Sequence, residues 1–239
     1  MKSIPNIITS LNLAAGFVAI VFILNGNPET ACWVLLAGMI FDFLDGFASR
    51  LLNAYSDLGK ELDSLADLVS FGVAPGLIIY SLLSDSVFPS GDIPTTGAVN
   101  LLLVAISALM PVCAGLRLAK FNIDPSQKIF FRGLPTPANA LAVISVVLAA
   151  HHGNSEFITS LASSPPAIIT YSLSLSLLMV TRIPLISLKF ASFNITNNLP
   201  RYILVVLCIL LVILLGLGGI IFIVPAYIIV SVIFTILSN

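Results

Sequence analysis

Charged residues are scarce in this chain. Of its 239 residues, only 9% are Asp, Glu, Lys or Arg, whereas 58% are hydrophobic, and the mean hydropathy is +1.10. A soluble domain carries about 25% charged residues. A chain with so little polar surface cannot hide its apolar side chains in one core. The composition therefore excludes an ordinary soluble domain and predicts an integral membrane protein.

A basic excess, disulfides and long hydrophilic loops are also lacking. A net charge of −1 gives no general affinity for nucleic acid. The cysteines all lie inside apolar runs, which favours inert packing residues over disulfide partners; they are Cys32, Cys113 and Cys208. No loop is long enough to hold a core of its own. The first apolar run lacks a small-residue cleavage site, so we expect a retained helix there.

The apolar runs predict an all-α protein, a polytopic bundle of about eight transmembrane helices. A helix needs roughly 20 apolar residues to cross a bilayer. The expected spans are residues 5–25, 30–52, 62–83, 97–120, 136–151, 164–181, 202–218 and 220–237. We expect a tight hairpin at Gly218-Gly219, between the last two spans. The segment 183–200 is either an amphipathic piece at the membrane surface or an ordinary loop.

The basic residues predict the orientation of the bundle. All ten lie at the N-terminus or after the second, fourth and sixth spans: Lys2, Arg50, Lys60, Arg117, Lys120, Lys128, Arg132, Arg182, Lys189 and Arg201. Positive charge collects on the cytoplasmic side, so we expect both termini to be cytoplasmic. His151 and His152 end the fifth span on the other side, where nothing close in the sequence completes a metal site. We expect them to be interfacial residues.

Acidic residues concentrate in one stretch, because six of the eleven fall between residues 42 and 67. One helix face carries the first set of residues, at spacings i, i+3, i+4 and i+7: Asp42, Asp45, Gly46 and Ser49. One face of the next helix carries the second set, at i, i+4 and i+8: Gly59, Asp63 and Asp67. A short connection can turn these faces toward each other. The spacing therefore predicts four carboxylates in one pocket at the cytoplasmic membrane surface.

Such a pocket favours a metal ion. Clustered carboxylates repel one another, and each costs roughly 2.5–3.5 kcal/mol at the centre of a membrane helix. Mg²⁺ suits carboxylates plus substrate phosphates, and Mn²⁺ accepts the same ligands. Gly46 and Gly59 let a bulky ligand approach the helix backbone, and Arg50 is placed to meet a phosphate. Intramembrane acids also mark ion routes, so a carboxylate-based ion transporter is an alternative.

The same residues resemble the signature of the CDP-alcohol phosphotransferases. The pattern reads Asp42-x-x-Asp45-Gly46-x-x-Ser49-Arg50, eight residues, then Gly59-x-x-x-Asp63-x-x-x-Asp67. That family usually has Ala at the position of Ser49, a small-for-small change. Its members are membrane enzymes that move a phosphatidyl or related group from a CDP-linked donor to an alcohol. The resemblance implies a six-helix phosphotransferase core over residues 1–182, and a cytoplasmic connection plus a C-terminal pair of transmembrane helices over 183–239.

Further stretches resemble the serine-accepting branch of this family. They are residues 4–12, 63–75, 117–122 and 133–138, with a weaker likeness through 182–184. The resemblance implies that CDP-diacylglycerol and L-serine react to give phosphatidylserine and CMP, a step of phospholipid biosynthesis at the cell (inner) membrane. It also implies a homodimer embedded in membrane lipid.

The resemblance assigns roles residue by residue. The ligands of two Mg²⁺ or Mn²⁺ ions would be Asp42, Asp45, Asp63 and Asp67. Asp67 would also be the general base toward the serine hydroxyl. The contacts of the CDP portion would be Asn6, Thr9, Gly46, Ser49, Arg50 and Gly59. The carboxylate of L-serine needs a cation, so the expected acceptor contacts are Arg117, Lys120, Asn122 and Arg132.

Other interpretations remain open at this point. The bases of the acceptor set also fit a role in topology and in binding lipid headgroups. An enzyme that uses glycerol 3-phosphate or inositol phosphate would keep the donor chemistry but want a denser basic pocket. An ion transporter would need polar residues across the whole membrane, whereas here the clustered acids stop at one end.

Overall fold

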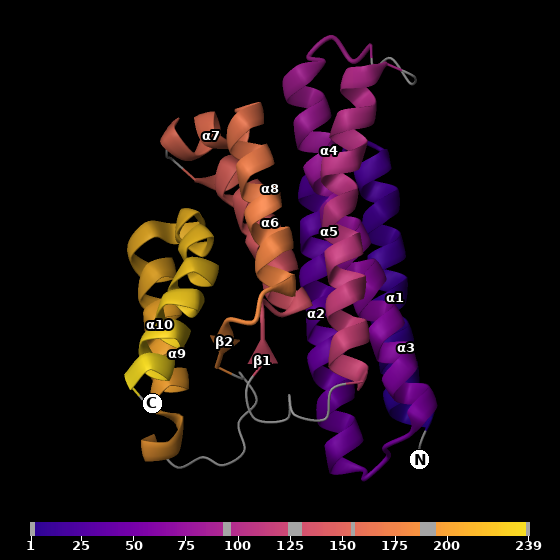
Figure 1. Ribbon diagram of the computed structural model, residues 1–239, viewed down its shortest axis with the longest axis vertical. Helices are drawn as coiled ribbons and strands as arrows, with labels where there is room; N and C mark the ends of the chain where they lie inside the picture. The colour runs from indigo at the N-terminus through magenta and orange to yellow at the C-terminus, as the bar shows by residue number, and fades with distance from the viewer. Residues whose placement is uncertain (1–2, 93–96, 124–130, 154–155, 187–194, 238–239) are drawn as a thin grey trace.

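The computed structural model describes residues 3–92, 97–123, 131–153, 156–186 and 195–237. These residues are almost entirely helical, and the long helices run alternately up and down (Figure 1). The first half contains α1 (Ser3–Leu24), α2 (Pro28–Leu51), α3 (Asp57–Leu68), α4 (Ala74–Val87) and α5 (Ala98–Ile123). The second half contains α6 (Thr136–His152), α7 (Glu156–Ala162), α8 (Pro165–Val180), α9 (Ile195–Leu215) and α10 (Ile223–Leu237). The predicted all-α bundle is confirmed.

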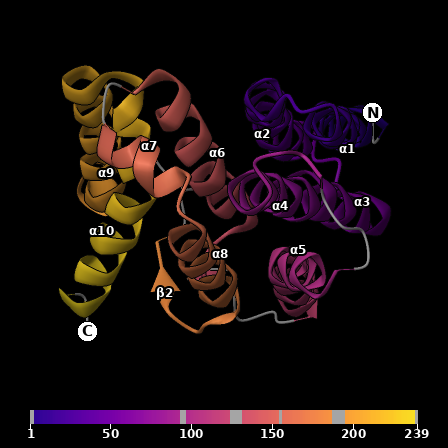
Figure 2. The same ribbon diagram turned by 90° about the horizontal axis from the view of Figure 1, so that it is seen from above.

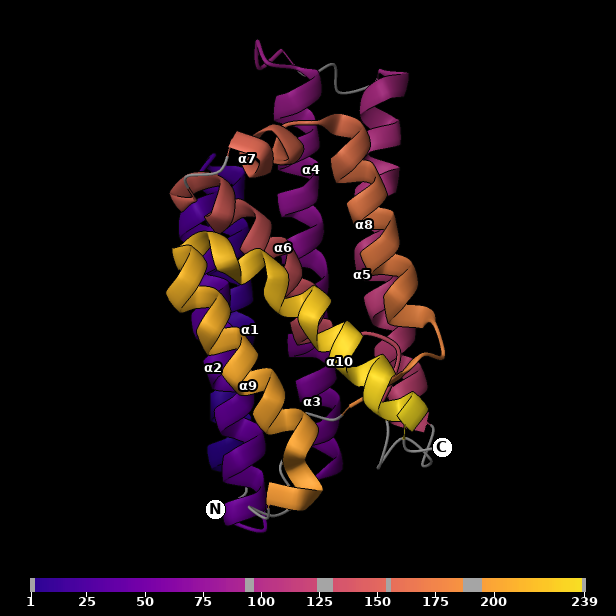
Figure 3. The ribbon, with the colours of Figure 1, turned by 90° about the vertical axis from the view of Figure 1, so that its left-hand side faces the viewer.

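Eight apolar helical stretches within the described ranges match the eight predicted spans. Four are long and apolar enough to cross a membrane: Ser3–Leu24, Pro28–Leu51, Asp57–Val87 and Ala98–Ile123. Four are shorter: Thr136–His152, Pro165–Val180, Leu199–Leu215 and Gly218–Phe234. Helix α1 begins and α10 ends at the same end of the bundle, as an even number of spans requires (Figures 1 and 3). The short helix α7 was not predicted.

Two predicted boundaries differ from the structure. The third span is longer than 62–83, because α3 and α4 continue through a π-helix, η1 (Val69–Val73), as one stretch of 31 residues. The predicted hairpin at Gly218-Gly219 is broader, because a 3-10 helix, η3 (Gly216–Phe222), joins α9 to α10. A Cβ on Gly219 would collide with the carbonyl oxygen of Leu211. Glycine is needed there for the close approach of η3 to α9.

A short strand pair links the start of α6 to the end of α8. Strand β1 (Phe131–Arg132) pairs antiparallel with β2 (Pro184–Leu185), and Arg132 lies opposite Pro184. The segment predicted as a surface piece or a loop therefore begins in β2, and α9 already starts at residue 195. Residues 187–194 of that segment lie outside the described ranges. The strand pair fixes the chain that leads into α6.

The buried core lies around α4 and α6. Figure 2 shows α4 between the α1–α2 pair and α5, and α6 between α2 and α9. These two helices supply fully buried side chains such as Ile78, Leu83, Ile144 and Leu148. Large apolar side chains on the outer helices are exposed, among them Phe17, Phe43, Leu102 and Ile213. Exposing so much apolar area to water is unfavourable by about 25 cal/mol per Å², whereas lipid removes that cost. The outer faces therefore suit an integral membrane protein.

Candidate metal and transfer site

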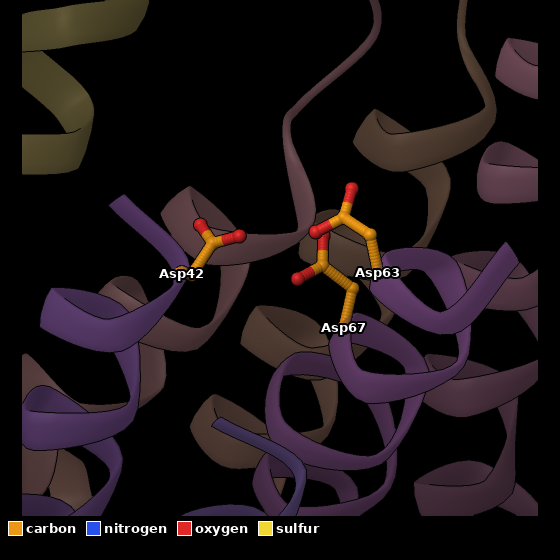
Figure 4. Close-up of side chains that lie close together, drawn as sticks. All are labelled: Asp42, Asp63 and Asp67. Atoms are coloured by element: carbon orange, nitrogen blue, oxygen red, sulfur yellow. The ribbon is translucent and has the colours of Figure 1, made fainter. Parts of the chain in front are cut away.

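Three of the four predicted carboxylates meet between α2 and α3. Asp42 lies on α2, whereas Asp63 and Asp67 lie one turn apart on α3 (Figure 4). One oxygen from each carboxylate lies within 4.8 Å of the other two. Asp42 and Asp63 are half-buried, and Asp67 is 8% exposed. Three of the four acids that the helical spacing places on facing stripes thus meet, and they come from two consecutive helices.

The start of α3 is fixed by a cap and by a glycine. Ser56 is the N-cap residue, and its hydroxyl accepts a hydrogen bond from the Gly59 amide at 3.0 Å, which satisfies one of the open N–H groups of the first turn. A Cβ on Gly59 would lie 2.9 Å from Asn6 Oδ1. Asp57 is exposed in the first turn of α3, where acids are favoured at a helix start.

The three-carboxylate cluster fits a divalent metal ion. Oδ2 of Asp67 accepts a hydrogen bond, but its buried Oδ1 has no hydrogen-bond partner among the described residues. A buried acceptor without a partner is unfavourable by about 1–3 kcal/mol, and more when charged. A hard cation offers that oxygen a ligand bond and offsets the repulsion within the cluster. The protein can therefore bind a metal ion through Asp42, Asp63 and Asp67.

The fourth predicted ligand lies apart from this cluster. Asp45 is on the same helix as Asp42, and it is 5% exposed. It does not belong to the group of described carboxylates that lie within 4.8 Å of one another. Its place in the metal site stays a prediction.

The predicted nucleotide contacts lie around α1 and the ends of α2 and α3. Asn6 faces Gly59, whereas Thr9 is buried and donates its hydroxyl to Pro5 O at 3.0 Å. Gly46 is exposed, and nothing lies within 4 Å of the position a Cβ would take. The exposed Arg50 donates from Nε to Gly46 O at 3.0 Å. The open backbone at Gly46 leaves room for a ligand, and the contact of Gly46 with a nucleotide stays a prediction. Ser49 is half-buried on the same helix.

A buried relay of hydrogen bonds joins a predicted acceptor residue to Asp67. Arg117 on α5 is 9% exposed and donates from Nη1 to Thr136 Oγ1 at 3.2 Å. Thr136, the first residue of α6, in turn donates to Asp67 Oδ2 at 3.2 Å. The guanidinium carbon of Arg117 also lies 6.0 Å from the centre of the Phe121 ring. Arg117, Thr136 and Asp67 are thus connected by two hydrogen bonds.

The other predicted acceptor residues have different surroundings. Asn122 donates from Nδ2 to Ser64 Oγ at 2.8 Å, and its backbone carbonyl oxygen accepts from Lys60 Nζ at 2.7 Å. These bonds clamp the end of α5 to α3. Lys120 is exposed. Arg132 lies in β1, and its side chain falls outside the described part of the structure.

Sequence reasoning missed the contribution of α6. Thr136 lies inside a stretch that resembles the serine-accepting branch, yet its partner Asp67 is 69 residues away in the chain. Asn139, one turn later, donates to Phe71 O in the π-helix at 3.3 Å. A π-bulge beside a candidate site is a recurrent functional feature. No local spacing signals these contacts, because they depend on how α6 packs against α3 and η1.

The two histidines also have a partner that the sequence did not suggest. His152 Nε2 lies 2.8 Å from Glu29 Oε1, and His151 Nδ1 lies 3.8 Å from Glu29 Oε2. Glu29 stands in the first turn of α2. These part-exposed side chains join the start of α2 to the end of α6.

Comparison with known proteins indicates the family of the chain. The model of the CDP-alcohol phosphatidyltransferase family matches residues 2–180. A CDP-diacylglycerol–serine O-phosphatidyltransferase from Bacillus subtilis is 37% identical over 194 residues, which are 81% of this chain and 93% of that protein. Proteins of the same name from Helicobacter pylori and Mycobacterium leprae are 32% and 38% identical, over 87% and 62% of this chain and 80% and 47% of their own lengths.

Proposed function

We propose, from the fact that this chain belongs to the CDP-alcohol phosphatidyltransferase family, that it transfers a phosphatidyl group from CDP-diacylglycerol to L-serine. The products would be phosphatidylserine and CMP. The cluster of Asp42, Asp63 and Asp67 carries the proposal, because its carboxylates lie within 4.8 Å of one another, as a site for pyrophosphate and metal requires. The names of the relatives from Bacillus subtilis and Helicobacter pylori support serine as the acceptor.

The reaction needs positioning and charge neutralisation more than covalent help. The serine hydroxyl oxygen attacks the phosphorus that carries diacylglycerol, and the bond from that phosphorus to CMP breaks. Asp67 accepts the proton of the serine hydroxyl. The predicted ligand set is Asp42, Asp45, Asp63 and Asp67. Mg²⁺ or Mn²⁺, in two sites, supplies positive charge to the pyrophosphate when bound.

Arg117 is the best supported of the predicted acceptor contacts. Its Nε is buried and has no hydrogen-bond partner among the described residues, whereas Nη1 is bonded to Thr136. A buried guanidinium donor without a partner suits a carboxylate. Thr136 links this group to Asp67, so one acceptor molecule with a carboxylate and a hydroxyl would have both ends engaged. Lys120, Asn122 and Arg132 stay predicted acceptor contacts.

The proposal also covers the nucleotide contacts, the extent of the core, the orientation in the membrane and the oligomeric state. Asn6, Thr9, Gly46, Ser49, Arg50 and Gly59 would surround the CDP portion, and the open space over Gly46 supports this. The family match to residues 2–180 supports a core over 1–182, with 183–239 as an addition. The distribution of Lys and Arg supports a cytoplasmic site and cytoplasmic termini at the cell (inner) membrane. We also propose a homodimer, as the resemblance implies.

The test is acceptor-dependent release of CMP. Purified protein with CDP-diacylglycerol and Mg²⁺ or Mn²⁺ should release CMP with L-serine and incorporate labelled serine into lipid. Glycerol 3-phosphate and inositol phosphate are the acceptors used for comparison. We expect at least about 100-fold lower kcat/KM with either, because neither has the carboxylate that Arg117 is proposed to bind. CMP release with one of these and none with serine would replace the acceptor. Ion flux into vesicles without CMP release would favour the transporter.

A further inference from the structure

Thr136 occupies an unusual position for a neutral side chain. It is fully buried, and its single hydroxyl lies between Arg117 and Asp67 at 3.2 Å from each. A guanidinium can only donate hydrogen bonds, and a hydroxyl has one hydrogen to give. The Thr136 hydrogen therefore points to Asp67 Oδ2, while the oxygen accepts from Arg117. The direction of the relay is fixed by the chemistry of its ends.

The surroundings hold Thr136 in this place from two sides. The chain before it is tied to the end of α8, since Gly133 N donates to Ile183 O and Leu134 N donates to Leu178 O, both at 2.9 Å. Gly133 has a φ of +79°, and a Cβ there would collide with backbone carbonyls of α8. One turn after Thr136, Asn139 donates to Phe71 O. Backbone contacts thus fix the start of α6 against the carboxylate.

The two oxygens of Asp67 consequently differ. Oδ2 accepts the Thr136 hydroxyl, and Oδ1 has no hydrogen-bond partner among the described residues. The terminal torsion of an aspartate side chain is broad, so without the hydroxyl the carboxyl plane would turn. A displacement of about 1 Å at a reacting group lowers a rate by about 100-fold.

We propose that Thr136 is a positioning residue that fixes the orientation of the Asp67 carboxylate. Thr136 holds Oδ2, and this leaves Oδ1, which has no hydrogen-bond partner among the described residues, turned toward the ligands that the proposed function brings to Asp67. This inference rests on the proposed function. A role confined to packing of α6 is the competing explanation.

The experiment compares three variants of α6 in the full-length protein. Thr136→Val removes the hydroxyl and keeps the shape, and Thr136→Ser keeps the hydroxyl. Ser145→Ala is the matched control, because Ser145 is also fully buried on α6 but donates to Ala142 O of its own helix at 2.7 Å. The measurements are kcat and KM from CMP release with serine, binding of CDP-diacylglycerol at equilibrium, and the melting temperature.

We expect Thr136→Val to lower kcat about 10- to 100-fold, with KM for CDP-diacylglycerol and its binding within about 3-fold of the wild type. Thr136→Ser should recover to within about 3-fold, and Ser145→Ala should match the wild type in kcat. If Thr136→Val does not fold, Thr136→Ala takes its place.

Equal kcat values for the Val and control variants would overturn the inference, as would a Ser variant as slow as Val. A wild-type protein that releases no CMP with serine would instead overturn the proposed function.

Discussion

Helix α6 runs between two ends of the bundle at which the carboxylates have different neighbours. At its first residue, Thr136 contacts Asp67, one of three acids within 4.8 Å of one another. At its last residue, about 24 Å further along the helix, His152 contacts the single acid Glu29 at 2.8 Å. The second end pairs one acid with two histidines, whereas the first brings one oxygen from each of three acids within 4.8 Å of one another. That difference indicates which end suits a cation, because clustered carboxylates repel one another and a hard cation offsets that repulsion.

Removal of the metal ion should have the largest effect on activity, and it tests the difference between the two ends most directly. Exhaustive treatment with a chelator should lower CMP release more than about 1,000-fold, because a bound cation lowers the activation barrier by several kcal/mol. Added Mg²⁺ or Mn²⁺ should restore it. Direct binding of Mn²⁺, followed by its paramagnetic resonance signal, should saturate in the wild type and weaken in Asp63→Asn. Full activity after chelation would mean that the cluster tolerates its own repulsion and needs no ion.

An isosteric change at each end then separates the two acids. Asp67→Asn should lower kcat at least about 100-fold, the usual scale for loss of a general base, while the protein still binds CDP-diacylglycerol and metal. Glu29→Gln makes the same carboxylate-to-amide change at the other end, and we expect kcat within about 2-fold of the wild type. Both variants should be compared by single-turnover CMP release. Near-normal turnover of Asp67→Asn would refute its role as the base.

The sequence predicted those parts of the molecule that depend on local spacing. Hydrophobic run length was enough for eight apolar helices, and the i, i+4 spacing placed Asp63 and Asp67 on one face. It could not separate Asp42 from Asp45, which share a face but lie one turn apart, about 4.5 Å along the axis. The packing of α3 against α2 decides whether the carboxylates of α3 lie beside Asp42 or beside Asp45.

Contacts between distant segments explain the other omissions. Thr136 is 69 residues from Asp67, and His152 is 123 residues from Glu29. A single sequence carries no periodic pattern across such separations. The π-helix η1 was missed for a related reason: it continues the helix without a break in composition, and its Phe71 carbonyl is satisfied by Asn139 of α6.

The smallest effect should come from the Glu29–His152 contact. These side chains are 39% and 38% exposed, and a part-exposed pair contributes about 0–1 kcal/mol to the free energy of unfolding. A double-mutant cycle with Glu29→Gln and His152→Ala, followed by denaturation in detergent, should give a coupling of that size. We expect 1 M salt to reduce the coupling, because it shortens the Debye length to about 3 Å and so weakens attraction between exposed charges. The kcat should be unchanged in each variant. A large loss of kcat in His152→Ala would show instead that α6 couples its two ends, and the contrast between a structural acid and a reactive one would no longer hold.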